Sequence, residues 1–116
     1  MSRKRDGVVR AMERLIEADQ EVRRHLVVAE RVLKRGITRL EAGEEISSAL
    51  AGTRAADHRQ DVNDALETLA LARHDLRIAV LAAGLDEGMS LSEVARGFGI
   101  SRQLVQRLAK ENGLAP

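Results

Sequence analysis

The sequence has no cysteine, no tryptophan, no tyrosine and a single phenylalanine among its 116 residues. Without cysteine the chain can form no disulfide, use no thiolate chemistry and hold no cysteine-ligated zinc. Without aromatic side chains it has no platforms on which bases of single-stranded DNA or RNA would stack, which disfavours that class of partner. No apolar run approaches the roughly 20 residues of a membrane-spanning helix, and the first ten residues contain no signal-peptide core, so we expect a cytoplasmic protein without membrane contact.

Hydrophobic residues make up 44% of the chain, and because aromatics are almost absent the core must consist of leucine, valine, isoleucine and alanine. Such a composition favours helices over sheets. Charged residues reach 32%, which suits long solvated helix faces. At this length we expect a single all-α domain with a modest core.

The formal net charge is only +1, but the charges are unevenly distributed. Residues 1–10 carry four basic and one acidic side chain, residues 11–89 eleven and fifteen, and residues 90–116 four and two. The three segments therefore have charges of +3, −4 and +2. Basic ends around an acidic middle favour a nucleic-acid partner without establishing one.

The last quarter of the chain carries the start and stop signals of a short helix. Ser90 and Glu93 form an S-x-x-E capping box, which predicts that this helix begins at Leu91. We expect it to stop near Gly97, because Gly99 follows where the backbone can enter a left-handed turn without a Cβ penalty.

A second short helix is expected over residues 101–112, where Ser101 is a suitable N-cap and Asn112 with Gly113 marks the end. Ala95 is small enough to let the two helices cross closely. Apolar residues stand on both sides of the turn: Val94, Phe98, Ile100, Val105 and Leu108. This spacing predicts a helix-turn-helix, which is typical of proteins that insert the second helix in the major groove of DNA.

The same stretch resembles the DNA-binding domains of the serine recombinase family, the resolvases and invertases, and more loosely those of sigma-factor-like and small bacterial regulators. The likeness lies in residues 92–96 (SEVAR), 99–102 (GISR) and 105–108 (VQRL). It covers only the last quarter of the chain, and nothing before Ser90 has the alternation of strands and helices that a catalytic recombinase domain requires. The resemblance therefore implies DNA binding and not recombination.

If the second helix lies in a major groove, its outer face presents six polar residues: Ser101, Arg102, Gln103, Gln106, Arg107 and Lys110. Arginine can pair with guanine through two hydrogen bonds and glutamine with adenine, whereas serine and lysine suit phosphate oxygens. By position we expect Arg102, Gln103 and Gln106 to contact base edges. The other three are expected to contact the phosphate backbone.

Upstream, apolar residues between residues 7 and 35 recur at spacings of three and four, which predicts a long amphipathic helix with a coiled-coil seam. Asp19 is the one polar intrusion. The seam residues are Val8, Met12, Leu15, Val22, Leu26, Ala29 and Leu33. The short helices at the C-terminal end cannot cover so long an apolar stripe. Another long helix must therefore cover it.

A break or kink is expected at Gly36, because Thr38 and Glu41 form a second capping box that predicts a new helix to about Ala51. Against a break, Ile37 and Leu40 nearly continue the seam.

Residues 52–56 are expected to form a turn, after which Asp57 with Gln60 begins the next long helix. Its seam is formed by Val62, Leu66, Leu69, Leu76, Val80 and Ala83. The helix should end near Ala83 in a Schellman-type stop with Gly84 left-handed and Leu85 packed back on Val80. Residues 85–89 would then connect it to the C-terminal head.

Other polar groups point to no further chemistry. The basic residues at positions 3–5 are expected to form a solvated terminus and not an arm that reaches a minor groove. The three histidines are scattered without a partner at metal-ligand spacing, and the acidic clusters resemble solvated helix faces. We therefore expect no cofactor, no metal site and no enzymatic activity.

These patterns together predict a homodimeric regulator of transcription that binds double-stranded DNA. Residues 1–56 would form a helical dimerisation or interaction region, and residues 57–116 would supply a connecting helix and the DNA-binding head. In one alternative the N-terminal helices bind another protein, such as polymerase, a sigma factor or a phage or plasmid partner, and the chain is an adaptor. In another it is a nucleoid-type protein that binds DNA with little sequence preference.

Overall fold

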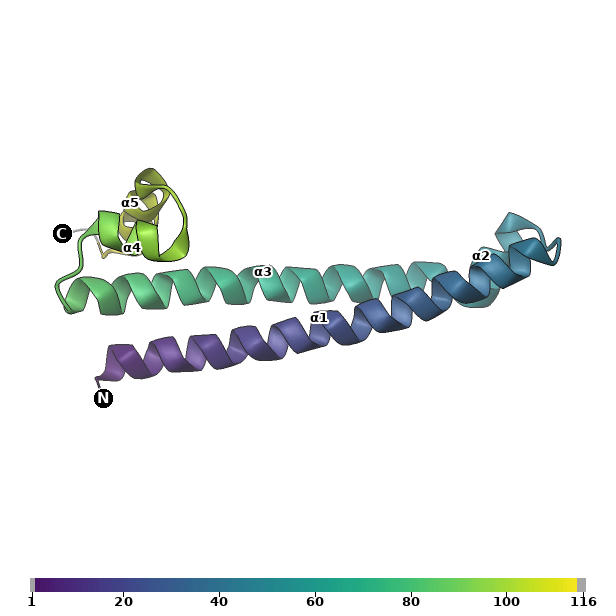
Figure 1. The fold of residues 1–116 in the computed structure, drawn as a ribbon, viewed down its shortest axis with the longest axis horizontal. Helices are drawn as coiled ribbons and strands as arrows, with labels where there is room; N and C mark the ends of the chain where they lie inside the picture. Colours follow the sequence, from purple (N-terminus) through teal and green to yellow (C-terminus); the bar gives the residue numbers. More distant parts are fainter. Residues whose placement is uncertain (1, 115–116) are drawn as a thin grey trace. The chain divides into compact units, whose positions relative to one another are not determined.

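The structure, a computed structural model, describes residues 2–114 and contains five helices and no strand within that range. The helices are α1 (Arg3–Glu41), α2 (Ile46–Thr53), α3 (Ala55–Asp86), α4 (Leu91–Phe98) and α5 (Arg102–Glu111) (Figure 1). The prediction of an all-α chain, with long helices first and two short ones last, is confirmed.

The chain packs into two compact units, each of which takes part of α1 and part of α3. The head unit comprises the residues up to Ile16 and those from Leu71 onward, and it includes α4 and α5. The α2 unit comprises Glu17–Ala70. The expected division of roles between residues 1–56 and 57–116 concerns function and stays a prediction.

α1 buries a narrow stripe of small side chains. Its most buried residues are Ala11, Ala18, Val22 and Val32. The predicted seam is therefore only partly right, because Met12, Leu26 and Leu33 are 47%, 44% and 68% exposed. Small side chains let a neighbouring helix approach closely, so the buried stripe follows alanine and valine. In α3, likewise, Ala65 and Ala83 are buried, while Leu66 of the predicted seam is exposed.

The predicted break at Gly36 is wrong, because α1 continues through it to Glu41. The Thr38 hydroxyl donates to the carbonyl oxygen of Lys34, 3.2 Å away within the helix, and caps no new one. A glycine inside a helix costs only about 1 kcal/mol, which the surrounding cooperative hydrogen bonding easily offsets. The chain leaves α1 instead at Gly43, whose φ of +88° is the left-handed stop.

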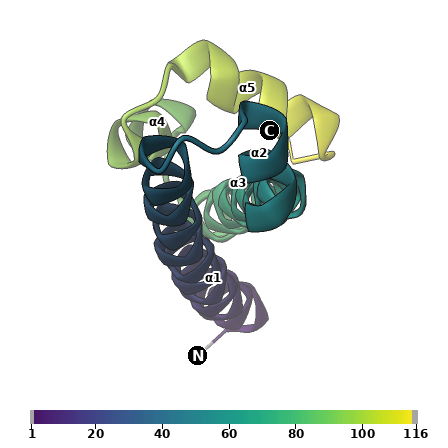
Figure 2. The same cartoon turned by 90° about the vertical axis from the view of Figure 1, so that its right-hand side faces the viewer.

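α2 occupies the first two residues of the segment predicted to be a turn. It extends to Thr53, and the chain reverses at Arg54 alone (φ 56°) before α3 begins at Ala55, so the turn expected over residues 52–56 is wrong. Gly52 is helical, and a Cβ there would collide with the guanidinium of Arg39. That guanidinium lies 3.3 Å from the carboxylate of Glu44. Figure 2 shows α2 folded beside the end of α1 and the start of α3.

α3 runs almost one turn past its predicted stop, to Asp86. The predicted Schellman-type stop lies four residues later than expected, because Gly88 has a φ of +91° and the N–H of Met89 donates to the carbonyl of Gly84 at 2.9 Å. Gly84 is helical and buried. A Cβ there would lie 3.0 Å from the sulfur of Met89 and 3.4 Å from Cγ2 of Val94. Close approach of Met89 and, less tightly, of Val94, not backbone conformation, accounts for this glycine.

The backbone at Gly36 and Gly43 predicts opposite effects of the same substitution. A Cβ meets no atom within 4 Å at either position, but only Gly43 has positive φ. Gly36→Ala should stabilise the protein by about 0.5–1 kcal/mol because alanine favours a helix. Gly43→Ala should destabilise it by about 1 kcal/mol or more. Urea unfolding followed by circular dichroism, at one protein concentration, measures both, and a loss of stability in Gly36→Ala would contradict a continuous α1.

Candidate nucleic-acid interface

The head is a small three-helix core, formed by the last turns of α3 with α4 and α5 (Figure 1). Its buried residues are Leu81, Val94, Ala95, Val105, Leu108 and Ala109. Leu81 comes from α3 and is 1% exposed, so α3 is the third helix of the head. Ala95 is 5% exposed in α4, which packs directly against α5, as expected for a small residue at a close crossing. Partly buried hydrophobic residues pack against this core, among them Leu85, Met89, Phe98 and Leu114.

The start of α4 is fixed by the predicted capping box. The Ser90 hydroxyl accepts a hydrogen bond from the N–H of Glu93 at 3.1 Å, and the Glu93 carboxylate accepts one from the N–H of Ser90 at 3.3 Å. The helix ends at Phe98, one residue beyond the expected position, and Gly99 has a φ of 66°. The N–H of Ile100 donates to the carbonyl of Ala95 at 3.1 Å and completes the stop.

α5 begins and ends at the predicted caps. The Ser101 hydroxyl accepts a hydrogen bond from the N–H of Leu104 at 3.1 Å, and Asn112 caps the other end by donating from Nδ2 to the carbonyl of Leu108 at 2.8 Å. Residues 99–101 therefore form a three-residue turn between α4 and α5. Its length is that of the turn in a helix-turn-helix.

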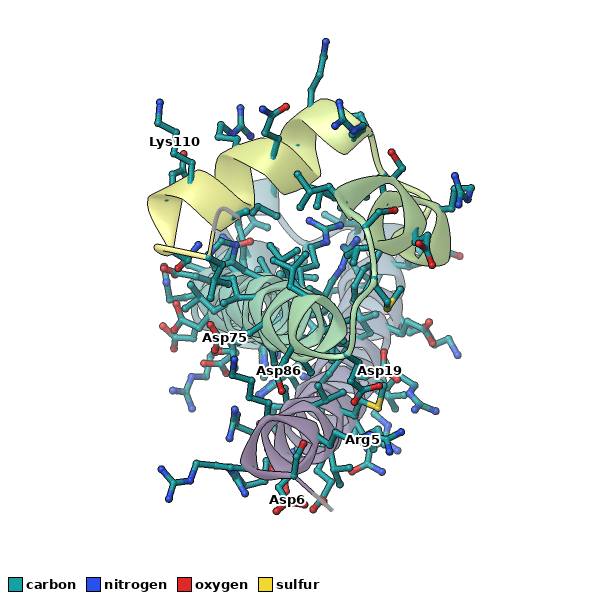
Figure 3. The ribbon with its side chains drawn as sticks, turned by 90° about the vertical axis from the view of Figure 1, so that its left-hand side faces the viewer. Arg5, Asp6, Asp19, Asp75, Asp86 and Lys110 are labelled. Carbon is teal, nitrogen blue, oxygen red and sulfur yellow. The ribbon has the colours of Figure 1, made fainter. Side chains whose placement is uncertain are left out.

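The residues predicted to contact DNA lie at the N-cap, in the first turn and on the outer face of α5. Every one of them is exposed: Ser101, Arg102, Gln103, Gln106, Arg107 and Lys110. The first turn of α5 holds no acidic residue, so nothing there would repel an anion near the helix N-terminus. Arg107 lies 3.8 Å from Glu111, in a pair whose side chains are both more than half exposed. Figure 3 shows the side chain of Lys110 pointing away from α3.

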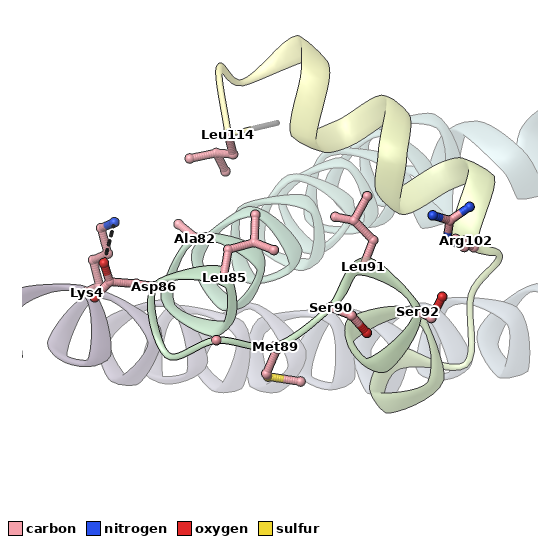
Figure 4. A pocket seen from close by; sticks show the side chains of 11 residues that line it. Lys4, Ala82, Leu85, Asp86, Met89, Ser90, Leu91, Ser92, Arg102 and Leu114 are labelled. Atoms are coloured by element: carbon pink, nitrogen blue, oxygen red, sulfur yellow. Dashed lines mark hydrogen bonds and ion pairs between the residues drawn. The ribbon is translucent and has the colours of Figure 1, made fainter. Parts of the chain in front are cut away.

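Arg102 also borders a hollow of about 580 Å³ on the surface of the head unit. The hollow extends along the end of α3 and the start of α4, with Leu85, Leu91 and Leu114 as its apolar lining. Figure 4 shows Arg102 at one end and the ion pair between Lys4 and Asp86 at the other. The Arg102 guanidinium thus stands at the edge of the head and is not enclosed by it.

The basic residues at the start of the chain are exposed, as expected of a solvated terminus, but they are helical and not frayed. They are the first turn of α1, and Lys4 lies 3.3 Å from Asp86 while Arg5 lies 3.1 Å from Glu87 at the end of α3. Figure 3 shows Arg5 and Lys110 on opposite sides of α3. Within the head unit this basic turn therefore faces away from the polar face of α5.

Other polar clusters offer no second site. Among residues 2–114 no group of three or more histidine, aspartate or glutamate side chains is arranged to hold a metal ion. Hydrogen bonds from Arg24 and from His25, the latter at 3.0 Å, hold the pKa of the exposed Glu21 carboxyl below its ordinary value. Over the same described range, no helix has the length and apolarity needed to cross a membrane.

Sequence reasoning missed part of the head core. Ala109 is 0% exposed, and Leu114 packs on the core after its N–H donates to the carbonyl of Ala109 at 2.7 Å. The sequence does contain a signal for the packing of Leu114. It is Gly113, because a glycine that ends a helix in the left-handed conformation brings the next residue back onto that helix.

Comparisons of the chain with protein families, with curated proteins and with solved structures find no match. We therefore argue function from the residues and geometry of this chain.

The polar face of α5 depends on a core that includes Leu81. Leu81→Ala should destabilise the protein by about 2–5 kcal/mol, because it removes a fully buried side chain and leaves a cavity. The matched control is Leu71→Ala in the same helix, where the side chain is 59% exposed and the loss should be within about 1 kcal/mol. Denaturant unfolding measures both, and equal losses would contradict the assignment of Leu81 to the core.

Proposed function

We propose that this chain binds double-stranded DNA in a sequence-specific manner, with α5 in the major groove, and acts as a homodimeric regulator of transcription. The observation that carries the proposal is the two-sided character of α5. Val105, Leu108 and Ala109 are buried on one side. Gln103, Gln106 and Lys110 are exposed on the other, and Arg102 is exposed in the first turn. A helix anchored by one face with long hydrogen-bonding side chains on the other suits insertion into a groove about 12 Å wide.

The connection between the two short helices supports the same proposal. In a helix-turn-helix the first helix crosses the DNA backbone and the second enters the groove, and a turn of three or four residues sets the angle between them. Residues 99–101 have that length, and Ala95 is buried in α4, which packs against α5.

In this proposal the outer residues of α5 divide into two sets. Arg102, Gln103 and Gln106 would contact base edges, where arginine suits guanine and glutamine suits adenine. Ser101, Arg107 and Lys110 would contact phosphates, which position the helix without reading sequence.

A single head makes few base contacts and would bind DNA weakly. The proposed DNA-binding form is therefore a dimer. Two heads held about 34 Å apart would bind successive major grooves on one side of the duplex and so read two half-sites. The helical part of the chain upstream of the head would supply the contact between the copies.

Selection of bound fragments from random duplex DNA tests the proposal. The unmodified protein should enrich a motif with two half-sites. Arg102→Ala combined with Gln106→Ala should weaken binding to that motif by about a hundredfold or more, because each base contact contributes about 1–3 kcal/mol of discrimination.

The matched control for this experiment is Arg14→Ala with Gln20→Ala, which removes the same side chains from exposed positions of α1. It should select the same motif as the unmodified protein. Enrichment of no fragment would favour the adaptor, and retention of all fragments alike would favour a nucleoid-type protein. An unchanged motif in the Arg102 and Gln106 variant would show that another surface reads the DNA.

Phosphate contact by Arg107 can be measured separately through salt dependence. Arg107→Ala should reduce the slope of log K against log salt by about 0.9, the contribution of one released counterion. Arg5→Ala is the control, since Arg5 is also exposed and paired with a glutamate, Glu87, but lies on the opposite side of α3 (Figure 3). In Arg5→Ala the slope of log K against log salt should stay unchanged. An equal reduction of this slope in both variants would contradict the assignment of DNA contact to the outer face of α5.

A further inference from the structure

The hollow of about 580 Å³ beside Arg102 has the size of a small-molecule site, because ligand pockets in proteins span roughly 300–1,000 Å³. Its apolar lining includes three leucines from different segments: Leu85 at the end of α3, Leu91 at the start of α4 and Leu114 after α5. Each of them packs against the head core and remains partly exposed. The hollow therefore offers apolar surface that an apolar molecule can remove from water.

The charges around the hollow are unequal at its two ends. Among the described residues that line it, only three are charged. Lys4 and Asp86 lie 3.3 Å apart at one end and neutralise each other, whereas Arg102 stands at the other end (Figure 4). Within residues 2–114, Arg102 takes part in none of the ion pairs. The hollow thus combines an apolar wall with one uncompensated positive charge.

This combination defines the class of ligand. A guanidinium binds a carboxylate through two parallel hydrogen bonds, and one net positive charge matches one carboxylate. A small anion such as acetate would leave the leucines uncovered. A dicarboxylate would place its second anionic group at the end where Asp86 already pairs with Lys4. The molecule that fits both features is an aliphatic chain with one terminal carboxylate.

We propose that this hollow binds an aliphatic monocarboxylate, whose carboxylate pairs with Arg102 and whose chain lies along Leu85, Leu91 and Leu114. The bound molecule releases the head from DNA, because the Arg102 guanidinium cannot pair with a carboxylate and with a base edge at once. The binding site does not depend on DNA, whereas this effector role rests on the proposed function. Ligand binding is therefore measured first without DNA.

Isothermal titration calorimetry of the full-length chain with octanoate tests the site. One octanoate should bind per chain. Acetate, which lacks the chain, and octan-1-ol, which lacks the carboxylate, should each bind at least about tenfold more weakly. Absence of saturable octanoate binding would overturn the proposal, and so would equal affinity for octan-1-ol.

Two pairs of variants locate the bound octanoate. Arg102→Gln should weaken its binding by about tenfold because the charged partner is lost, and the control Arg107→Gln, on α5 but outside the hollow, should not. Ala82→Leu should weaken binding because the larger side chain fills the hollow, and the control Ala70→Leu, at an exposed position of α3 outside it, should not. Circular dichroism should show unchanged helix content in all four variants. Equal octanoate affinity in all four would place the ligand elsewhere and overturn the proposal.

The effector role is tested with the duplex that the unmodified protein selects. Saturating octanoate should weaken DNA binding by about tenfold, the contribution of one base contact. Ala82→Leu should bind this duplex like the unmodified protein, but octanoate should no longer weaken that binding. Octanoate that binds the chain without changing its affinity for DNA would overturn the effector role. A chain that binds octanoate but no duplex would contradict the proposed function, and with it the effector role, while the ligand site would stand.

Discussion

Burial of one face of α5 is the constraint on which the proposed function depends. A ten-residue helix is not stable by itself in water, so its outer side chains have a fixed direction only because Val105, Leu108 and Ala109 are held in a core. Leu81 closes that core from α3. The same burial leaves Gln103, Gln106 and Lys110 exposed on the opposite face. Packing and the proposed recognition of DNA are therefore two consequences of one arrangement.

α1 has more apolar residues than its neighbouring helices cover. The buried stripe passes through Ala11, Ala18 and Val22, and the exposed one through bulkier residues such as Leu33 and Ile37. Both follow a spacing of three and four, so periodicity alone cannot decide which one faces the protein. The predicted seam therefore contains both buried and exposed residues. Close approach of neighbouring helices favours the smaller side chains inside and leaves the larger ones exposed.

Glycine shows why some helix ends could be predicted and others could not. Gly99 stops α4 as expected because the capping signals of Ser90 and Ser101 on either side agree with it. Gly36 and Gly84 looked like stops but are helical. At Gly36 no competing contact favours a break, and at Gly84 a Cβ would come within 3.0 Å of the Met89 sulfur, so that a small residue fits best inside α3. A glycine required for close packing and one required for a left-handed turn are identical in the sequence.

The sequence by itself determined the helical class, the bounds and caps of α4 and α5, and the exposure of six polar residues from Ser101 to Lys110, because these depend on local hydrogen bonds and on spacing within one helix. Only the tertiary structure decided which stripe of α1 is buried, and that the basic first turn pairs with Asp86 and Glu87. It also decided that aliphatic side chains of α1 and α2 gather around one hollow. These features join residues far apart in the chain, and their positions follow from packing between helices, which no local pattern encodes.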